Sequence, residues 1–276
     1  MKKVLLVICI LSTSSLAWAQ ATAPSLGTAA TFAVLGSAVT CTGPGVISGD
    51  VGATGAFTNT PVCTIAGGTP PATDTAATLA QTALTTVYQN ALAANSSCTL
   101  PLLPAVPPAS FTLMPGVYCS TAALTLTNIT LTLDAGGNAN AVWVIKIGAG
   151  LTGTEFQVVM ANGGQPCNVY WLVGADSTLT TSTFQGNILA GGPTGSFTST
   201  GGTLIGRVLA NGAVTLTGPN IHGTCALAAQ GGAGCKNDDD NRDEDKDHDR
   251  GDDHDRNHRD KDKDRDHKDK DHRDDD

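Results

Sequence analysis

A five-residue segment recurs in the second half of this chain, at 168–172, 186–190 and 206–210, with starts 18 and 20 residues apart. A second, different segment follows each copy: Thr178-Leu179-Thr180, then Ser196-Phe197-Thr198, then Ala213-Val214-Thr215. Two short strands that recur in phase with this period are typical of a solenoid, in which each coil of the chain stacks on the one before it. The repeat therefore predicts a stack of β-coils.

Alternation along the second segment predicts which side chains face solvent. Successive side chains of a strand point to opposite faces, so their neighbours point outward if Leu179, Phe197 and Val214 point inward. Gly150-Leu151-Thr152 and Ala38-Val39-Thr40 look like further copies. The predicted outward ladder is Thr178, Thr180, Ser196, Thr198, Ala213 and Thr215, with Thr152, Thr154 and Thr40 as candidates for its ends.

One segment has a helical pattern. Residues 76–94 are rich in Ala, Leu and Gln, and Thr73-Asp74 can cap an N-terminus, so we expect a helix over about 74–94. The residues of its apolar stripe are Leu84, Val87, Tyr88, Ala91 and Leu92. Such a helix is about 30 Å long, and seven coils stacked at about 4.8 Å span about 33 Å. One helix can therefore lie along the whole solenoid.

Both ends of the chain differ from this central part. Lys2 and Lys3, a short apolar run and Ala17-Trp18-Ala19 form the pattern of a secretory signal peptide over residues 1–19. We therefore expect a secreted or extracellular protein, with the periplasm or the cell surface as alternatives. Residues 236–276 hold 12 basic and 20 acidic residues, a net charge of −8. Such a segment buries too little apolar surface to fold, which predicts a disordered charged tail after a domain over 20–235.

The low charge of residues 20–235 argues against catalysis. Lys146 and Arg207 are its basic residues, and its five acidic residues are scattered, whereas carbohydrate cleavage needs clustered carboxylates. Asp50 and Asp134 lie beside glycines, where they would stabilise turns. We expect no enzyme activity, catalytic residue, metal or cofactor, no nucleic-acid partner and no membrane insertion. The tail is either a solvated spacer or a segment that binds cations or a charged cell surface weakly.

Seven cysteines remain after the signal peptide, and none forms a Cys-x-x-Cys pair. Disulfides in an oxidising compartment are therefore favoured over a zinc site. Proximity in sequence suggests Cys41–Cys63, Cys98–Cys119 and Cys167–Cys225, which leaves Cys235 over.

Several segments, in this order around the predicted helix, resemble the microbial ice-binding proteins from about residue 24 to 223. They are 26–35, Gly49-Asp50-Val51-Gly52, 113–118, 141–145, 167–171, 186–190 and 206–210. The resemblance implies a mainly β fold, a right-handed β-helix (solenoid) with one long α-helix packed alongside. It also implies adsorption to ice by a flat face of outward Thr, Ser and Ala side chains, here the predicted ladder.

Two functions remain open at this point. A rigid array of hydroxyls and methyls can order water at regular spacings without any charge, and Thr has few side-chain geometries in a strand. Threonine is also simply suited to exposed β-sheet. The alternative to ice binding is therefore a secreted adhesion or surface-matrix module without ice activity.

Overall fold

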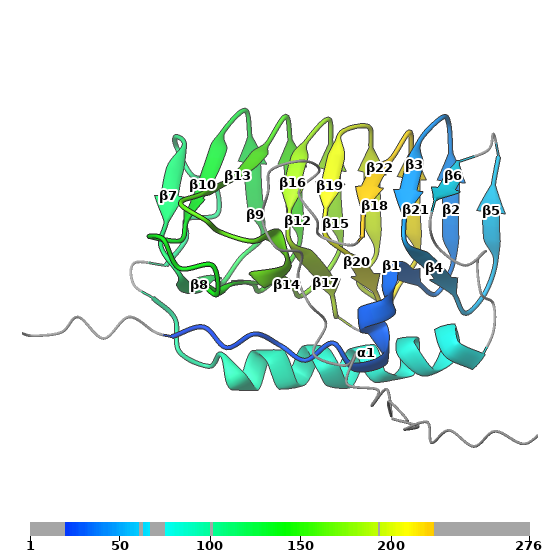
Figure 1. The fold of residues 1–276 in the computed structure, drawn as a ribbon, viewed down its shortest axis with the longest axis horizontal. Coiled ribbons are helices and arrows are strands. Elements are labelled where there is room, and N and C mark those ends of the chain that lie inside the picture. Colours follow the sequence, from blue (N-terminus) through cyan, green and yellow to red (C-terminus); the bar gives the residue numbers. More distant parts are fainter. Residues whose placement is uncertain (1–19, 61–62, 67–74, 100–101, 193, 224–276) are drawn as a thin grey trace, which may run out of the picture. The chain divides into compact units, whose positions relative to one another are not determined.

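Three parallel β-sheets and a long α-helix make up the computed structural model, which describes residues 20–60, 63–66, 75–99, 102–192 and 194–223 (Figure 1). The predicted signal peptide, the predicted cap Thr73-Asp74 and the charged tail lie outside these residues. Each circuit of the chain adds one strand to each sheet in turn, as a solenoid requires. The sequence predicted two strands in each coil, whereas the structure has three. The third strand of each coil, and the sheet that these strands form, was not predicted.

Sheet A has seven strands. In spatial order they are β4 (Asp50–Ala53), β1 (Phe32–Gly36), β20 (Val208–Ala210), β17 (Asn187–Ala190), β14 (Val169–Val173), β11 (Trp143–Ile147) and β8 (Gly116–Ser120).

Sheet B also has seven strands and follows sheet A in each circuit. In spatial order they are β5 (Phe57–Asn59), β2 (Val39–Thr42), β21 (Val214–Thr217), β18 (Phe197–Thr200), β15 (Ser177–Thr180), β12 (Leu151–Thr154) and β9 (Leu124–Thr127).

Sheet C closes each circuit and has eight strands. In spatial order they are β6 (Thr64–Ala66), β3 (Val46–Ser48), β22 (Asn220–His222), β19 (Thr203–Ile205), β16 (Thr183–Gln185), β13 (Gln157–Ala161), β10 (Thr130–Asp134) and β7 (Phe111–Leu113). Two short 3₁₀ helices, η1 (Gly27–Thr31) and η2 (Pro166–Asn168), precede β1 and β14.

The stack does not follow the order of the chain. Strands β1 to β6 form two coils, after which the chain runs along α1 (Thr75–Ala94) and resumes with β7 at the other end (Figure 1). From there the coils return until β20, β21 and β22 pair with β1, β2 and β3. We call this junction between the two ends of the domain the seam. Arg207 strengthens it, since its Nε donates to the Ala30 carbonyl oxygen at 2.9 Å.

The helix agrees with its prediction and explains why sheet A is buried on both sides. Leu84, Tyr88 and Ala91 of the predicted stripe are buried, and so are Ala77 and Ala80. They pack on the outer side of sheet A, where Leu189 and Leu209 are fully buried. No helix among the described residues is long and apolar enough to span a membrane.

A partly buried lysine connects the end of α1 to sheet A. The Nζ of Lys146 on β11 donates to the carbonyl oxygen of Asn95 at 2.7 Å, just past the last helical residue. Positive charge is favourable there because the last carbonyls of a helix lack partners within it. Burial lowers the pKa of the Lys146 ammonium group. Asn95 also exchanges two hydrogen bonds with the backbone of Thr22, so the N-terminal segment is held at the same point.

The first repeated segment was misaligned by one residue in one of its three copies. The sequence alignment placed Tyr170 opposite Ile188, but the structure pairs Trp171 with Ile188 and Tyr170 with Asn187. A slip of one residue exchanges the two faces of a strand. Trp171 consequently lies inside the solenoid, with its ring centroid 4.7 Å from that of Phe184, and Tyr170 faces the helix side. The alignment of 186–190 with 206–210 is confirmed.

Two of the three predicted disulfides are present, Cys41–Cys63 and Cys98–Cys119. Cys167 is also disulfide-bonded, while its predicted partner Cys225 and the leftover Cys235 lie outside the described residues. Cys98–Cys119 ties the chain after α1 to β8, and residues 102–105 lie against the end of the stack, where the Thr125 backbone N–H donates to the Ala105 carbonyl oxygen at 2.8 Å. This segment covers part of an otherwise open sheet edge, which would be prone to unwanted pairing.

Candidate functional site

The outward face of sheet B carries two parallel rows of threonine. Each strand from β9 to β2 has threonine at its second and fourth positions, with the residues between them directed inward. The first row is Thr125, Thr152, Thr178, Thr198, Thr215, Thr40 and Thr58, and the second is Thr127, Thr154, Thr180, Thr200, Thr217 and Thr42. We call these two rows the threonine face.

The spacing of the threonine face follows from sheet geometry. Neighbouring strands lie about 4.8 Å apart and residues two positions apart along a strand lie about 6.6 Å apart. All thirteen threonines are exposed or half-exposed. The face is therefore a regular grid of hydroxyl and methyl groups without an interruption in either row.

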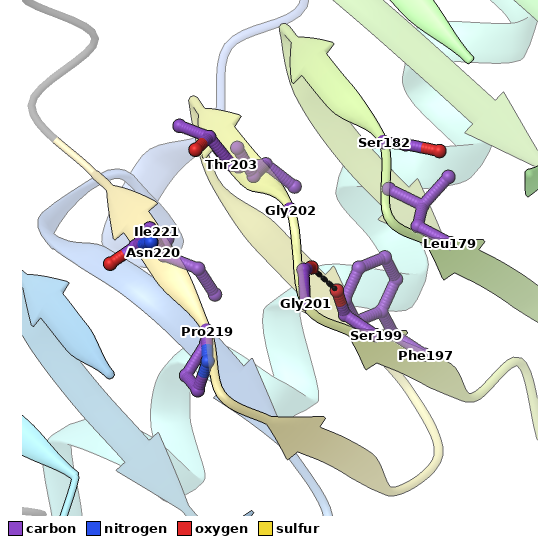
Figure 2. Close-up of a pocket in the computed structure, with 11 residues that line it drawn as sticks. Leu179, Ser182, Phe197, Ser199, Gly201, Gly202, Thr203, Pro219, Asn220 and Ile221 are labelled. Atoms are coloured by element: carbon purple, nitrogen blue, oxygen red, sulfur yellow. Dashed lines mark hydrogen bonds between the residues drawn. The ribbon is translucent and has the colours of Figure 1, made fainter. Parts of the chain in front are cut away.

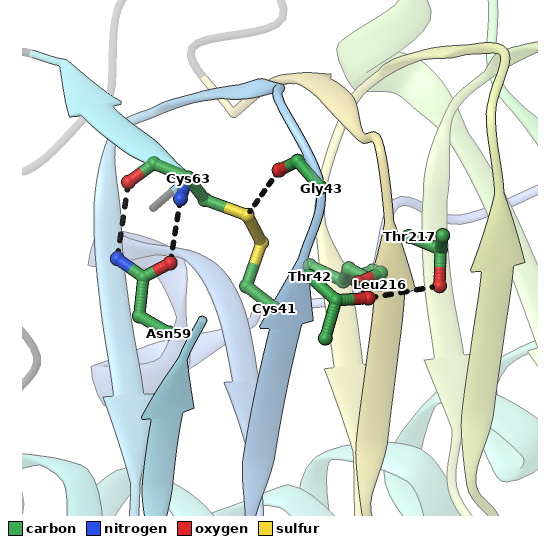
Figure 3. Close-up of a disulfide and its surroundings, with 7 residues drawn as sticks. All are labelled: Cys41, Thr42, Gly43, Asn59, Cys63, Leu216 and Thr217. Carbon is green, nitrogen blue, oxygen red and sulfur yellow. Dashed lines mark hydrogen bonds between the residues drawn. A yellow bond between two sulfur atoms is a disulfide. The ribbon is translucent and has the colours of Figure 1, made fainter. Parts of the chain in front are cut away.

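Most hydroxyls of this grid remain available to solvent. Among the described residues, Thr42 and Thr217 are the two members whose hydroxyls bond within the protein, to each other at 3.2 Å (Figure 3). This contact crosses the seam between β2 and β21. The Thr42 hydroxyl also donates to the Leu216 carbonyl oxygen at 3.3 Å.

A disulfide supports the face from inside at the seam. Cys41 lies between Thr40 and Thr42 but is fully buried and points inward to Cys63 (Figure 3). The Asn59 side chain exchanges two hydrogen bonds with the backbone of Cys63, at 2.6 and 3.0 Å. The registers of Thr40 with Thr215 and of Thr42 with Thr217 are regular, so the disulfide does not distort the rows.

The structure places seven of the nine predicted positions on the threonine face. Thr178, Thr198, Thr215, Thr152 and Thr40 share the first row, and Thr180 and Thr154 lie in the second. Ser196 and Ala213 do not belong to either row, because their strands begin one residue later. They lie in a flanking row with Asp176, as the backbone bonds from Ser177 N to Ser196 O and from Phe197 N to Ala213 O show.

The wrong placement of Ser196 and Ala213 has a local cause. The alignment set Leu179 opposite Phe197 and Val214, but the structure pairs Ser177 with Phe197 and Leu179 with Ser199. Each strand has two inward positions. In β15 the first is Ser177 and the second is Leu179, whereas in β18 the apolar residue Phe197 comes first. Matching the apolar residues therefore shifts the alignment of these two strands by two residues. The pattern x-Thr-x-Thr recurs in six strands and predicts the correct register. It would also have found the members of these strands that were missed, Thr125, Thr127, Thr200, Thr217 and Thr42, and the same pattern at 57–60 contains Thr58.

Neither other sheet offers a comparable face. The helix covers sheet A. Sheet C presents a mixture that includes Val46 and Val159, which are 36% and 41% exposed, as well as Gln157 and His222. Regular outward chemistry is thus confined to sheet B.

Possible metal ligands and hollows are the remaining features to locate among the described residues. The described residues contain no group of three or more His, Cys, Asp or Glu side chains that could hold a metal ion. A hollow of about 10 Å³ lies beneath the corner of sheets B and C, beside Leu179, Phe197 and Ser199 (Figure 2). It has room for about one water molecule, whereas ligand pockets measure about 300 Å³ or more.

Comparison with known proteins identifies the family. The family model described as Ice-binding-like matches residues 34–222. This chain belongs to the ice-binding-like family. A protein of Nostoc sp. (strain HG1) named ice-binding protein is 39% identical over 213 residues, which cover 74% of this chain and 76% of the relative.

Solved structures of the ice-binding-like family agree with the fold. A crystal structure of an ice binding protein from an Antarctic biological consortium is 32% identical with a TM-score of 0.61, and the match covers 78% of this chain and 95% of that one. The ice-binding protein 1 domain of Shewanella frigidimarina is 27% identical with a TM-score of 0.63, over 73% and 98% of the two chains.

Proposed function

We propose that this protein binds ice by adsorption of the threonine face, without a catalytic step or a cofactor. The observation that carries the proposal is the grid of two threonine rows on a sheet whose register is held by coils, helix and disulfide. An ice surface offers no net charge to pair with, so a binder gains from a rigid array that water can match in spacing. The ice-binding names of the relatives agree with this function.

Rigidity is the physical advantage of the fold for this task. Threonine is restricted about its first side-chain bond, and every threonine except the four at the row ends lies between two others of its row, so little side-chain entropy remains to be lost on binding. An adhesion or matrix module would not require two uninterrupted rows of one residue type. The function that the geometry supports best is therefore inhibition of ice growth and recrystallisation.

One experiment tests the proposal. Wild type and Thr198→Tyr are compared for thermal hysteresis and ice recrystallisation inhibition. Thr183→Tyr serves as the matched control, because Thr183 is an exposed threonine on sheet C. We expect the wild type and the control to be active and Thr198→Tyr to lose most of the activity, since a bulky ring holds the flat face away from ice. An inactive wild type contradicts ice binding and favours the adhesion module.

Three further features remain proposals from the sequence. We propose a right-handed coil, because connections between parallel strands of one sheet are right-handed in nearly all proteins. Export directed by residues 1–19 is supported by the disulfides, which fit an oxidising compartment. For residues 236–276 we retain the charged, solvated tail that their composition predicts.

A further inference from the structure

The threonine face has two borders, and the first is the row of residues that precede its strands. Backbone hydrogen bonds align these positions from coil to coil, for example from Leu151 N to Asp176 O and from Val214 N to Ala38 O. From the β9 end the row reads Ala123, Gly150, Asp176, Ser196, Ala213, Ala38 and Ala56. Asp176 is its one charged member, and its carboxylate accepts from the Ser196 backbone N–H at 2.9 Å.

The second border follows the fourth residue of each strand. In six coils this corner residue has a positive φ, between 49° and 76°. From the β9 end the residues are Asn128, Glu155, Thr181, Gly201, Gly218 and Gly43. The first three are exposed side chains, and the last three are glycines.

The two borders divide the threonine face into unlike halves. Around β9, β12 and β15 the borders carry two exposed carboxylates, Asp176 and Glu155. Around β18, β21 and β2 no border residue is larger than Ser196. Removing water from an ionised carboxylate that has no counter-ion is strongly unfavourable, and an ice lattice supplies no counter-charge. The carboxylates therefore disfavour contact with ice at the edges of the half around β9, β12 and β15. No charged residue does so at the edges of the half around β18, β21 and β2.

We propose, on the basis of the function proposed above, that the contact with ice is centred on the charge-free half formed by β18, β21 and β2. Its threonines are Thr198, Thr200, Thr215, Thr217, Thr40 and Thr42. This half spans the seam, where the Thr42 and Thr217 hydroxyls bond to each other. The contact surface is thus assembled from residues near both ends of the domain.

Two matched pairs of variants test this inference by thermal hysteresis. Thr215→Tyr and Thr152→Tyr place the same ring in the first row, on the charge-free half and on the charged half, and both threonines are exposed. Ala213→Asp and Ala123→Asp place the same carboxylate in the first border of each half, at exposed alanines that directly precede a strand. Thermal unfolding of all four variants checks that the fold is kept.

We expect Thr215→Tyr and Ala213→Asp to lose most of the hysteresis, and Thr152→Tyr and Ala123→Asp to keep nearly all of it. Equal losses within the pairs, or larger losses at Thr152 and Ala123, overturn the inference while leaving ice binding in place. A wild type without activity overturns the proposed function and this inference with it.

Discussion

At the scale of single residues, the corner after each threonine pair places an unusual demand on the backbone. Thr181 has a φ of 49°, in the left-handed region that a β-branched residue rarely occupies. Gly201 occupies the same corner one coil later with a φ of 62°, and a Cβ at Gly201 would meet no other atom within 4 Å. Substitutions at these two positions therefore test the cost of the left-handed backbone conformation without a steric clash of the side chain.

Gly201→Thr is expected to lower the free energy of unfolding by about 1–2 kcal/mol, the cost of a left-handed conformation with a Cβ. Thr181→Gly should raise it by a smaller amount, because the added glycine also increases the entropy of the unfolded chain. Urea unfolding of both variants measures the changes. A Gly201→Thr variant as stable as the wild type would show that the corner is not strained.

Asp134 contributes a pH-dependent turn. The Asn162 side-chain amide, at 2.7 Å, and the Gly136 backbone N–H, at 2.8 Å, donate to its carboxylate and lower its pKa below the ordinary 3.8. This arrangement confirms the turn-stabilising role predicted for Asp134. Because the pKa is lower in the folded state, the carboxylate stabilises the fold above pH 3.8 and this contribution disappears as the pH falls through the folded value.

Asp134→Ala should therefore be less stable than wild type at neutral pH, and the difference should shrink in acid below the ordinary aspartate pKa. Chemical unfolding across that pH range measures it. A difference that stays constant with pH would exclude an ionised Asp134 as its source.

At the scale of elements, the helix and sheet A form a second core outside the coil. Glycine allows this close approach at Gly191, where a Cβ would collide with the ring of Tyr88. Leu84 is fully buried in this core, whereas Leu79 on the same helix is 58% exposed. Helix packing, rather than helix propensity alone, is thus expected to hold α1 in place.

Leu84→Ala should lower the free energy of unfolding by about 2–5 kcal/mol, because it leaves a cavity between α1 and sheet A. Leu79→Ala is the matched control and should change it by less than about 0.5 kcal/mol. Thermal or urea unfolding measures both. Equal effects of the two substitutions would contradict the packing of α1 on sheet A.

At the scale of the whole molecule, the threonine rows depend on closing the seam. Residues 39–42 lie beside residues 214–217, although most of the chain separates them in sequence. Six parallel strands, Arg207 and the Thr42–Thr217 bond join the two ends of the domain. All members of the threonine face lie between residues 40 and 217, and none belongs to the charged tail.

Truncation after Cys235 should therefore leave thermal hysteresis and the melting temperature close to those of the full chain. Both are measured on the purified proteins at equal concentration. Loss of hysteresis at an unchanged melting temperature would instead assign the tail a direct part in the activity.

Local patterns in the sequence were sufficient for the solenoid, the helix, two disulfides and seven of the thirteen threonines, because period, alternation and helical spacing depend on near neighbours. The apolar residues alone left the register open, because a strand with Ser177 and Leu179 inward fits two registers by that criterion. The structure pairs these residues with Phe197 and Ser199, as the threonine pattern also indicates. Adjacency across the seam was decided only by tertiary structure. The seam brings Thr40 beside Thr215 because the last coils return to the first, a contact that no local pattern in the chain encodes.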